Sequence, residues 1–270
     1  MIYLSTSSKA VKHTSKVIYN KNIMHSIVTG LVFLFSVYAL YVACSLLSFT
    51  QIPFIADILF LILAVLVIIP LTMGIVRYYW RIICDVVDNP VCIFYYLSDF
   101  KLYKKALFLT FSLCFKAFLR ALIIFAPALT VKLITQEFFY SFLKIPIPLW
   151  VGNFGPIFNG LVFLGIIALF FSMIRYGLTF ALFVFDENME VEEIMNMSNI
   201  ISKKSSVDLI YLFASFIPLI LLSLLIFPLI FTLPYFCIAY LIHARYAVTE
   251  FNSHIEKLQQ NTSVDYFEGI

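Results

Sequence analysis

The sequence predicts an all-α membrane protein, a polytopic bundle of about six transmembrane helices with a parallel internal repeat of span–elbow–span hairpins. Of the 270 residues, 63% are hydrophobic and 12% are charged, whereas an ordinary soluble domain has roughly 25% charged residues. A single protein core cannot enclose that much apolar surface, so lipid must be the solvent for most of it. Apolar runs of membrane-spanning length and a repeated motif support the same fold class.

Six apolar runs define the expected organisation of the chain. We expect a basic N-terminal segment at residues 1–25 that lies on the membrane surface, a transmembrane domain at 26–247 and a soluble tail at 248–270. The first run is too long for the apolar region of a signal peptide, so it is expected to be a retained span. The expected spans are 27–49, 54–76, 106–131, 157–185, 209–226 and 228–243.

The last apolar stretch, residues 209–242, allows two interpretations. As one helix it would be roughly 50 Å long, which exceeds a bilayer core of about 30 Å unless the helix is strongly tilted. Pro218, Pro228 and Pro234 offer break points. We favour two short spans with a turn near Phe227–Pro234, and a single kinked helix is the alternative.

A motif recurs in the two halves of the chain. Arg-Tyr begins both copies, at Arg77 and Arg175, and an aspartate stands eleven residues further on in each, at Asp88 and Asp186. Both copies are expected to run inward, turn at an elbow and run outward, so the repeat is parallel. Parallel repeats occur in transporters with substrate sites between the halves. Duplication of a stable helical hairpin, without transport, is the simpler interpretation.

The distribution of basic residues predicts the orientation. Six spans place both termini and both elbows on one side, and the opposite side carries only Lys132 and Lys144. The positive-inside rule therefore places both termini in the cytoplasm, which indicates a multi-pass protein of the cell membrane. The predicted cytoplasmic side carries Lys9, Lys12, Lys16, Lys21, Arg77, Arg81, Lys101, Lys104, Lys105, Lys203, Lys204, Arg245 and Lys257.

Reporter fusions test this orientation. Fusions after residue 95, after residue 200 and at the C-terminus are expected to report a cytoplasmic location, because each follows a basic segment. Fusions near residues 140–150 are expected to report the outside. An external C-terminus would contradict the orientation.

Lys116 and Arg120 are the best candidates for a binding site, because they interrupt an apolar run. They lie near mid-membrane if the helix begins at Ala106, and one turn separates them, so they share a face. Basic groups at that depth cost about 3 kcal/mol or more unless they are paired or hydrated. We consider two interpretations: internal salt bridges with snorkelling of the terminal arginines, or a basic pocket that binds an anionic lipid headgroup. The candidate pocket residues are Lys116, Arg120, Arg77, Arg175, Asp88 and Asp186.

The second half of the chain resembles a family of bacterial membrane proteins. Arg175-Tyr176, the acidic turn at Asp186, Ser198, Lys203 and the later Leu233-Pro234-Tyr235 are similar to motifs of the family grouped as domain of unknown function 975. The likeness to the membrane domain of some glycerophosphodiester phosphodiesterases is more distant. The chain departs from the family pattern at Ile194 and Lys204, where the family has alanine and glycine. The resemblance implies a multi-pass fold and carries over no catalytic residue.

No pattern typical of an enzyme is found. The sequence contains no GxxxxGK[ST], HExxH or GxSxG motif, and its five cysteines are scattered without a CxxC pair, so we expect no catalysis, metal or cofactor. The net charge of +3 is too small to predict binding to nucleic acid. We expect a non-enzymatic binding or transport-related component that handles a lipid, peptide or other amphiphile, with membrane lipids and another membrane protein such as an exporter as partners. The alternative is a structural or accessory subunit of a membrane complex, or a resistance- or immunity-type protein; an intramembrane enzyme ranks third.

Overall fold

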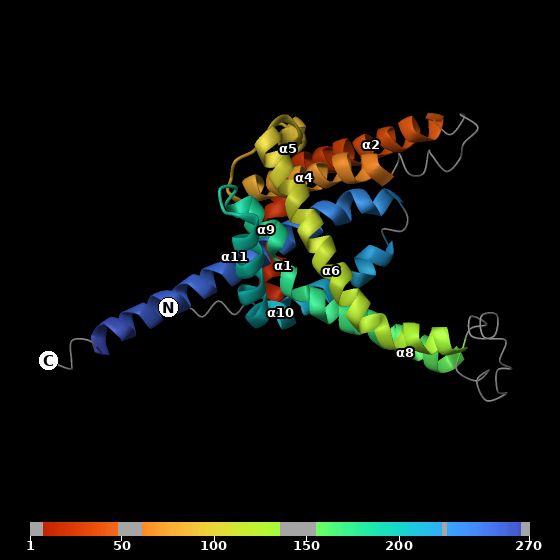
Figure 1. The fold of residues 1–270 in the computed structure, drawn as a ribbon. Helices are drawn as coiled ribbons and strands as arrows, with labels where there is room; N and C mark the ends of the chain where they lie inside the picture. The colour runs from red at the N-terminus through yellow and green to blue at the C-terminus, as the bar shows by residue number, and fades with distance from the viewer. Residues whose placement is uncertain (1–7, 48–60, 136–154, 223–225, 266–270) are drawn as a thin grey trace. The chain divides into compact units, whose positions relative to one another are not determined.

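The computed structural model describes residues 8–47, 61–135, 155–222 and 226–265, and the elements found there are all helical (Figure 1). The predicted all-α helical bundle is therefore confirmed. The α-helices are α1 Ser8–Lys21, α2 Ile23–Leu47, α4 Ile69–Ile83, α5 Tyr95–Ser98, α6 Phe100–Thr135, α8 Gly155–Met173, α9 Thr179–Phe185, α10 Val191–Leu222 and α11 Ile226–Asp265. The shorter turns are a π-helix, η1 Ala64–Ile68, and two 3₁₀-helices, η2 Pro90–Phe94 and η4 Ile174–Tyr176.

Five helical segments of the described chain are long and apolar enough to cross a membrane. They are Ile23–Ala43, Leu61–Ile83, Phe100–Lys132, Pro156–Phe185 and Pro228–Glu256. Four of them match the first four expected spans in position. The expected span at 209–226 falls in the second half of α10, whose described apolar part ends at Leu222.

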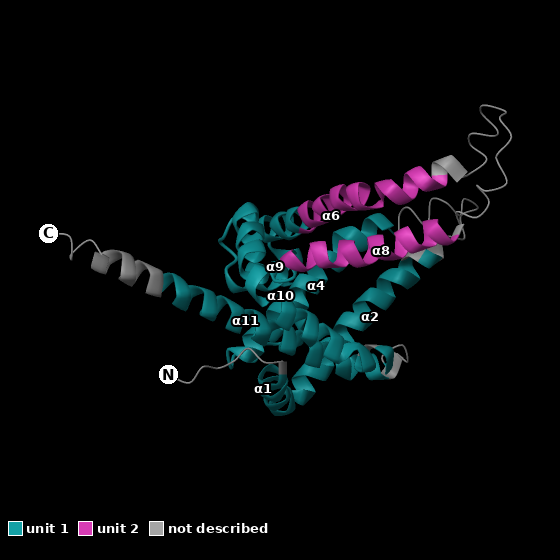
Figure 2. Cartoon of the chain, turned by 90° about the horizontal axis from the view of Figure 1, so that it is seen from below, with its two compact units in different colours: residues 1–109, 176–270 teal, residues 110–175 magenta. Residues whose placement is uncertain are grey.

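The chain divides into two compact units (Figure 2). Unit 1 consists of residues 1–109 and 176–270, and unit 2 consists of residues 110–175. Unit 2 contains most of α6 and all of α8. Unit 1 contains the remaining helices, and its core includes the fully buried side chains of Tyr79, Tyr96 and Phe216.

Local sequence signals explain where the elements around the first elbow begin and end. At the end of α4, Asp85 adopts a left-handed conformation with φ 59°, and the Val86 and Asp85 amides donate to the carbonyls of Arg81 and Ile82. This is the Schellman arrangement that commonly ends helices. Asn89 then begins η2 by accepting a hydrogen bond from the amide of Val91 at 3.1 Å.

The side chain of Asp99 determines where α6 begins. Its Oδ1 accepts hydrogen bonds from the amides of Lys101 at 2.9 Å and Leu102 at 3.3 Å, which is the N-cap role that aspartate favours. The helix consequently starts at Phe100 and not at Ala106, where the sequence predicts it.

The fourth expected span, 157–185, is interrupted in the structure. Helix α8 ends at Met173, η4 follows, and α9 begins at Thr179. Gly177 lies in the interruption, where its low helix propensity weakens the helix. The phenol of Tyr240 on α11 donates to the carbonyl of Gly177 at 2.7 Å, so the break is stabilised by a tertiary hydrogen bond.

The last apolar stretch forms two helices, and the predicted position of the turn is wrong. Helix α10 ends at Leu222 and α11 begins at Ile226, so Phe227 and Pro234 both lie inside α11. The rings of Phe213 and Phe236 lie 5.6 Å apart and those of Phe216 and Tyr235 5.1 Å apart, so α10 and α11 pack as an antiparallel hairpin. Proline is tolerated in the first turn of a helix, which explains why Pro228 does not end one.

Two segments expected on the membrane surface are packed into unit 1. Helix α1 lies against α11, with Val11 and Ser15 fully buried. The second elbow is short, because α10 is continuous from Val191 into the apolar stretch. Packing against α11 therefore covers the apolar face that the sequence assigns to lipid.

Candidate functional site

Three of the six predicted pocket residues belong to each compact unit. Those in unit 1 are Arg77, Asp88 and Asp186, and those in unit 2 are Lys116, Arg120 and Arg175. The two groups are described separately.

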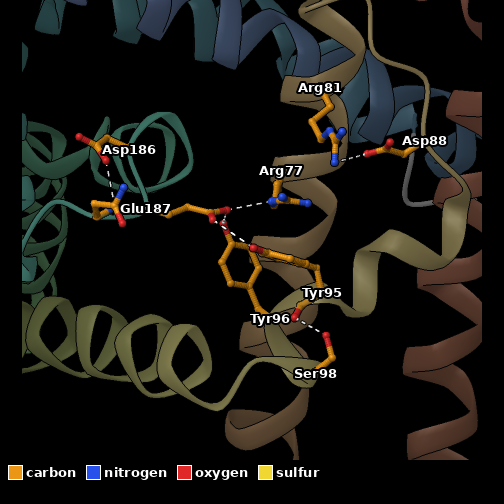
Figure 3. Close-up of polar contacts among 9 residues, drawn as sticks. Arg77, Arg81, Asp88, Tyr95, Tyr96, Ser98, Asp186 and Glu187 are labelled. Carbon is orange, nitrogen blue, oxygen red and sulfur yellow. Dashed lines mark hydrogen bonds and ion pairs between the residues drawn. The ribbon is translucent and has the colours of Figure 1, made fainter.

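In unit 1, the carboxylate of Glu187 is the centre of a polar cluster (Figure 3). Arg77 Nε lies 2.8 Å from Glu187 Oε1. The same oxygen accepts a hydrogen bond from the Tyr96 hydroxyl at 2.8 Å, and Oε2 accepts one from Tyr95 at 3.4 Å. The guanidinium of Arg77 also lies 3.6 Å from the centre of the Tyr95 ring, in a cation–π contact. The arginine is therefore held by a charge and by an aromatic face.

Four segments meet at this Glu187 cluster. Arg77 comes from α4, the two tyrosines from α5, and Glu187 from the turn after α9. Lys105 on α6 donates to the backbone carbonyl of Glu187. The ring of Tyr96 lies 5.4 Å from Phe183 on α9. The cluster thus connects the segment after α4 to the turn after α9.

Burial affects the Tyr96 phenol and the Arg77–Glu187 pair. Tyr96 is fully buried, and this desolvation, with the neighbouring Glu187 charge second, raises the pKa of its phenol well above its ordinary value. The phenol therefore stays protonated at neutral pH and remains a hydrogen-bond donor to Glu187. The side chains of Arg77 and Glu187 are only 17% and 24% exposed, so their pair is screened far less than a surface ion pair.

The two predicted aspartates have other partners. Asp88 pairs with Arg81 at 2.8 Å, and Asp186 Oδ1 accepts a hydrogen bond from the Asn188 amide at 2.9 Å. Arg77 forms its ion pair with Glu187, which is not among the six candidate pocket residues. The position of Glu187 directly after Asp186 in the acidic turn is the signal that could have placed it among the candidates.

In unit 2, Arg120 and Arg175 line one open hollow of about 400 Å³, together with Phe171 and Ser172. Arg120 Nη1 donates to the backbone carbonyl of Ser172 and, at 2.9 Å, to its hydroxyl. Ser172 belongs to the last turn of α8, where backbone carbonyls lack helical partners. A cation there is also favoured by the helix dipole. Lys116 lies one turn from Arg120 on α6 and is half-buried.

The position of the hollow along α8 indicates its depth. Helix α8 has 19 residues and no charged side chain, so it is about 28 Å long, close to the thickness of a bilayer core. Arg175 is the second residue after its end. Arg120 therefore lies beside the C-terminal turn of α8, at the end of the helix that Arg175 follows. An anion held by these two guanidinium groups would be at headgroup level.

Among the described residues, no group of three or more His, Cys, Asp or Glu side chains is placed to hold a metal ion. Comparison of the chain with protein-family models, with curated proteins and with solved structures finds no match. The helices define the class: this is an all-α, membrane-embedded protein with several apolar helices of spanning length. The resemblance to domain of unknown function 975 stays a prediction from the sequence.

Proposed function

We propose that the chain is a non-enzymatic, multi-pass membrane protein that binds an anionic amphiphile, with a phospholipid headgroup held at the Arg120–Arg175 hollow. The observation that carries this proposal is the pair of arginines at the charged end of an otherwise uncharged helix of spanning length. Guanidinium groups suit phosphate because their planar donors match its oxygens. Phe171 and the neighbouring apolar face of α8 would contact the acyl chains.

Removal of the two charges tests the proposal. Each basic residue near a membrane surface contributes about 1 kcal/mol to the binding of an anionic lipid, so Arg120→Gln/Arg175→Gln is expected to weaken binding of phosphatidylglycerol roughly 30-fold. Native mass spectrometry of the purified protein, titrated with phosphatidylglycerol and with phosphatidylcholine, measures this change. Binding of phosphatidylcholine should change little.

Lys132→Gln is the matched control, because Lys132 lies on the same helix as Arg120, is exposed, and is not part of the hollow. Arg175→Gln alone is a second variant, since the exposed Arg175 side chain can be replaced with little risk to folding. Equal lipid binding by the double variant and by Lys132→Gln would contradict the proposal. Copurification of one stoichiometric protein, with no bound lipid, would favour the accessory-subunit function.

A further inference from the structure

Helix α11 is buried like the core helix of a globular body. In the apolar stretch of α11 that is long enough to cross a membrane, 50% of the residues are buried within the protein. The corresponding share for α2, in the same unit, is 22%. The side chains of Ile238, Ala239, Leu241 and Ile242 are at most 3% exposed. Protein contacts therefore account for about half of the apolar stretch of α11, a larger share than in α2.

Contacts within unit 1 show which part of α11 is level with the charged end of α4. That end carries Arg77, Trp80 and Arg81, the basic and aromatic residues typical of a membrane surface. In the same turn, the Tyr79 hydroxyl donates to the carbonyl of Ser26 on α2 at 3.1 Å. One turn further along α2, a Cβ on Gly30 would lie 3.9 Å from that hydroxyl and 3.6 Å from both the Ile230 carbonyl and the Pro234 ring. Ile230 and Pro234 are thus level with the surface end of α4.

From this level the helices continue for very different lengths. Helix α2 continues from Gly30 to Leu47, which is about 26 Å, and the helical segment that begins at Leu61 leads to Arg77 over about 24 Å. Helix α11 begins at Ile226, only about 6 Å beyond Ile230. The bilayer core is about 30 Å thick. From this level, α2 and the α4 segment therefore extend over most of that thickness, whereas the start of α11 extends over only about a fifth of it.

Helix α1 gives an independent indication of the same level. Lys12 Nζ donates to the carbonyl of Ser215 on α10 at 3.2 Å, and the ring of Tyr19 lies 5.9 Å from that of Tyr235 on α11. The outer face of α1 exposes Lys9, His13 and Lys16. Exposed lysines require water or headgroups around them, so the hairpin at Ser215 and Tyr235 is outside the bilayer core.

We propose that the α10–α11 hairpin does not cross the membrane. It belongs to a helical body on the predicted cytoplasmic side, and its tip inserts into the cytoplasmic leaflet only, to the depth of about 5–10 Å that interfacial helices reach. The exposed side chains of Ile217, Leu221 and Leu222 at the end of α10 are the surface that contacts the lipid acyl chains of that leaflet. This inference is independent of the anion hollow in unit 2. It keeps both termini in the cytoplasm, so reporter fusions at the termini cannot distinguish it from two short spans.

Thiol labelling at the hairpin tip distinguishes the two topologies. Leu222→Cys is treated in intact cells with a maleimide that does not cross membranes, and the native chain is labelled in parallel to subtract its five cysteines. Leu222 is 52% exposed, so the new thiol is accessible if the tip reaches the outer water. Pro156→Cys, at the start of α8, is the external control, and Lys204→Cys, on the predicted cytoplasmic side, is the internal control.

The proposal predicts that labelling of Leu222→Cys in intact cells equals that of Lys204→Cys and is at least tenfold below that of Pro156→Cys. Inverted membrane vesicles should reverse the order of Pro156→Cys and Lys204→Cys. Leu221→Cys, at a neighbouring exposed position, provides a second variant. Labelling of either tip variant in intact cells at more than half the level of Pro156→Cys would overturn the proposal and support two short spans.

Discussion

Gly74→Ala is expected to destabilise the folded protein by about 3 kcal/mol or more, the upper end of the cost of overpacking a core. A Cβ at this position would lie 1.8 Å from the carbonyl oxygen of Ile93 and 2.7 Å from its carbon. These are backbone atoms of η2, which Asn89 caps and in which Ile93 is fully buried. Thermal unfolding of the purified protein should show a melting temperature lower by about 6–12 °C.

Two other glycines provide graded controls on helix α8. Among the residues that the structure describes, no atom outside the local helix lies within 4 Å of a Cβ at Gly160, so Gly160→Ala should be neutral or stabilising by up to about 1 kcal/mol through helix propensity. A Cβ at Gly165 would meet the ring of Phe125 at 2.6 Å, and a side chain can rotate away, so Gly165→Ala should be intermediate. A melting temperature of Gly74→Ala equal to that of Gly160→Ala would contradict the close packing of α4 on η2.

The fold class and the first four spans can be predicted because they depend on composition and on the length of apolar runs, which are properties of the local sequence. Composition alone requires lipid as solvent, and uncharged runs of spanning length need no tertiary information. The cap residues Asn89 and Asp99 are also readable, since their side chains act on the amides two or three residues further on. Such signals are local, and the structure places the corresponding helix starts beside them.

Elements that depend on tertiary contacts are predicted less well. The prolines near Phe227–Pro234 favour a turn there, but α11 continues through them. Hydropathy assigns residues 228–243 to lipid, whereas Ile238, Ala239 and Leu241 within this segment are fully buried in the protein. An apolar run has the same composition in either environment, so the sequence cannot separate a core helix from a span.

In the candidate site, too, local features can be predicted and contacts between distant residues cannot. Arg77 is identifiable as a charged residue at the end of an apolar run, but several carboxylates are available to pair with it. Its partner, Glu187, is 110 residues away along the chain, and spacing carries no information at that separation. The contact of Arg120 with Ser172 is likewise unpredictable, because it requires the register of α6 against α8.

Arg77→Met is expected to destabilise the protein by about 2–3 kcal/mol, because it leaves the charge of Glu187 largely buried without its cation. The partial exposure of the pair, 17% for Arg77 and 24% for Glu187, lowers this value from that of a fully buried pair. Methionine keeps much of the apolar length of arginine, so packing should change little. The free energy of unfolding or the melting temperature measures the effect.

Lys21→Met is the matched control. Lys21 pairs with Asp85 at 2.7 Å, a distance similar to that of Arg77 and Glu187, but their side chains are 67% and 77% exposed. The hydrogen bond and charge of Lys21 lower the pKa of Asp85, yet water and salt screen such a pair, so its contribution to stability is small. Lys21→Met should therefore change the melting temperature little. Equal losses in Lys21→Met and Arg77→Met would show that burial does not determine the strength of these pairs.

The stability of a double variant then distinguishes the effect of the charge from the effect of packing. In the Arg77→Met background, Glu187→Gln removes the unpaired charge while keeping an acceptor for the Tyr96 hydroxyl. The double variant is therefore expected to be more stable than Arg77→Met alone, although Glu187→Gln by itself should destabilise the native chain by leaving Arg77 without its anion. A double variant whose loss equals the sum of the two single losses would exclude direct coupling. The connection between the two elbows would then depend on the stacking of Arg77 on Tyr95 and on the ring contacts of Tyr96 with Phe183.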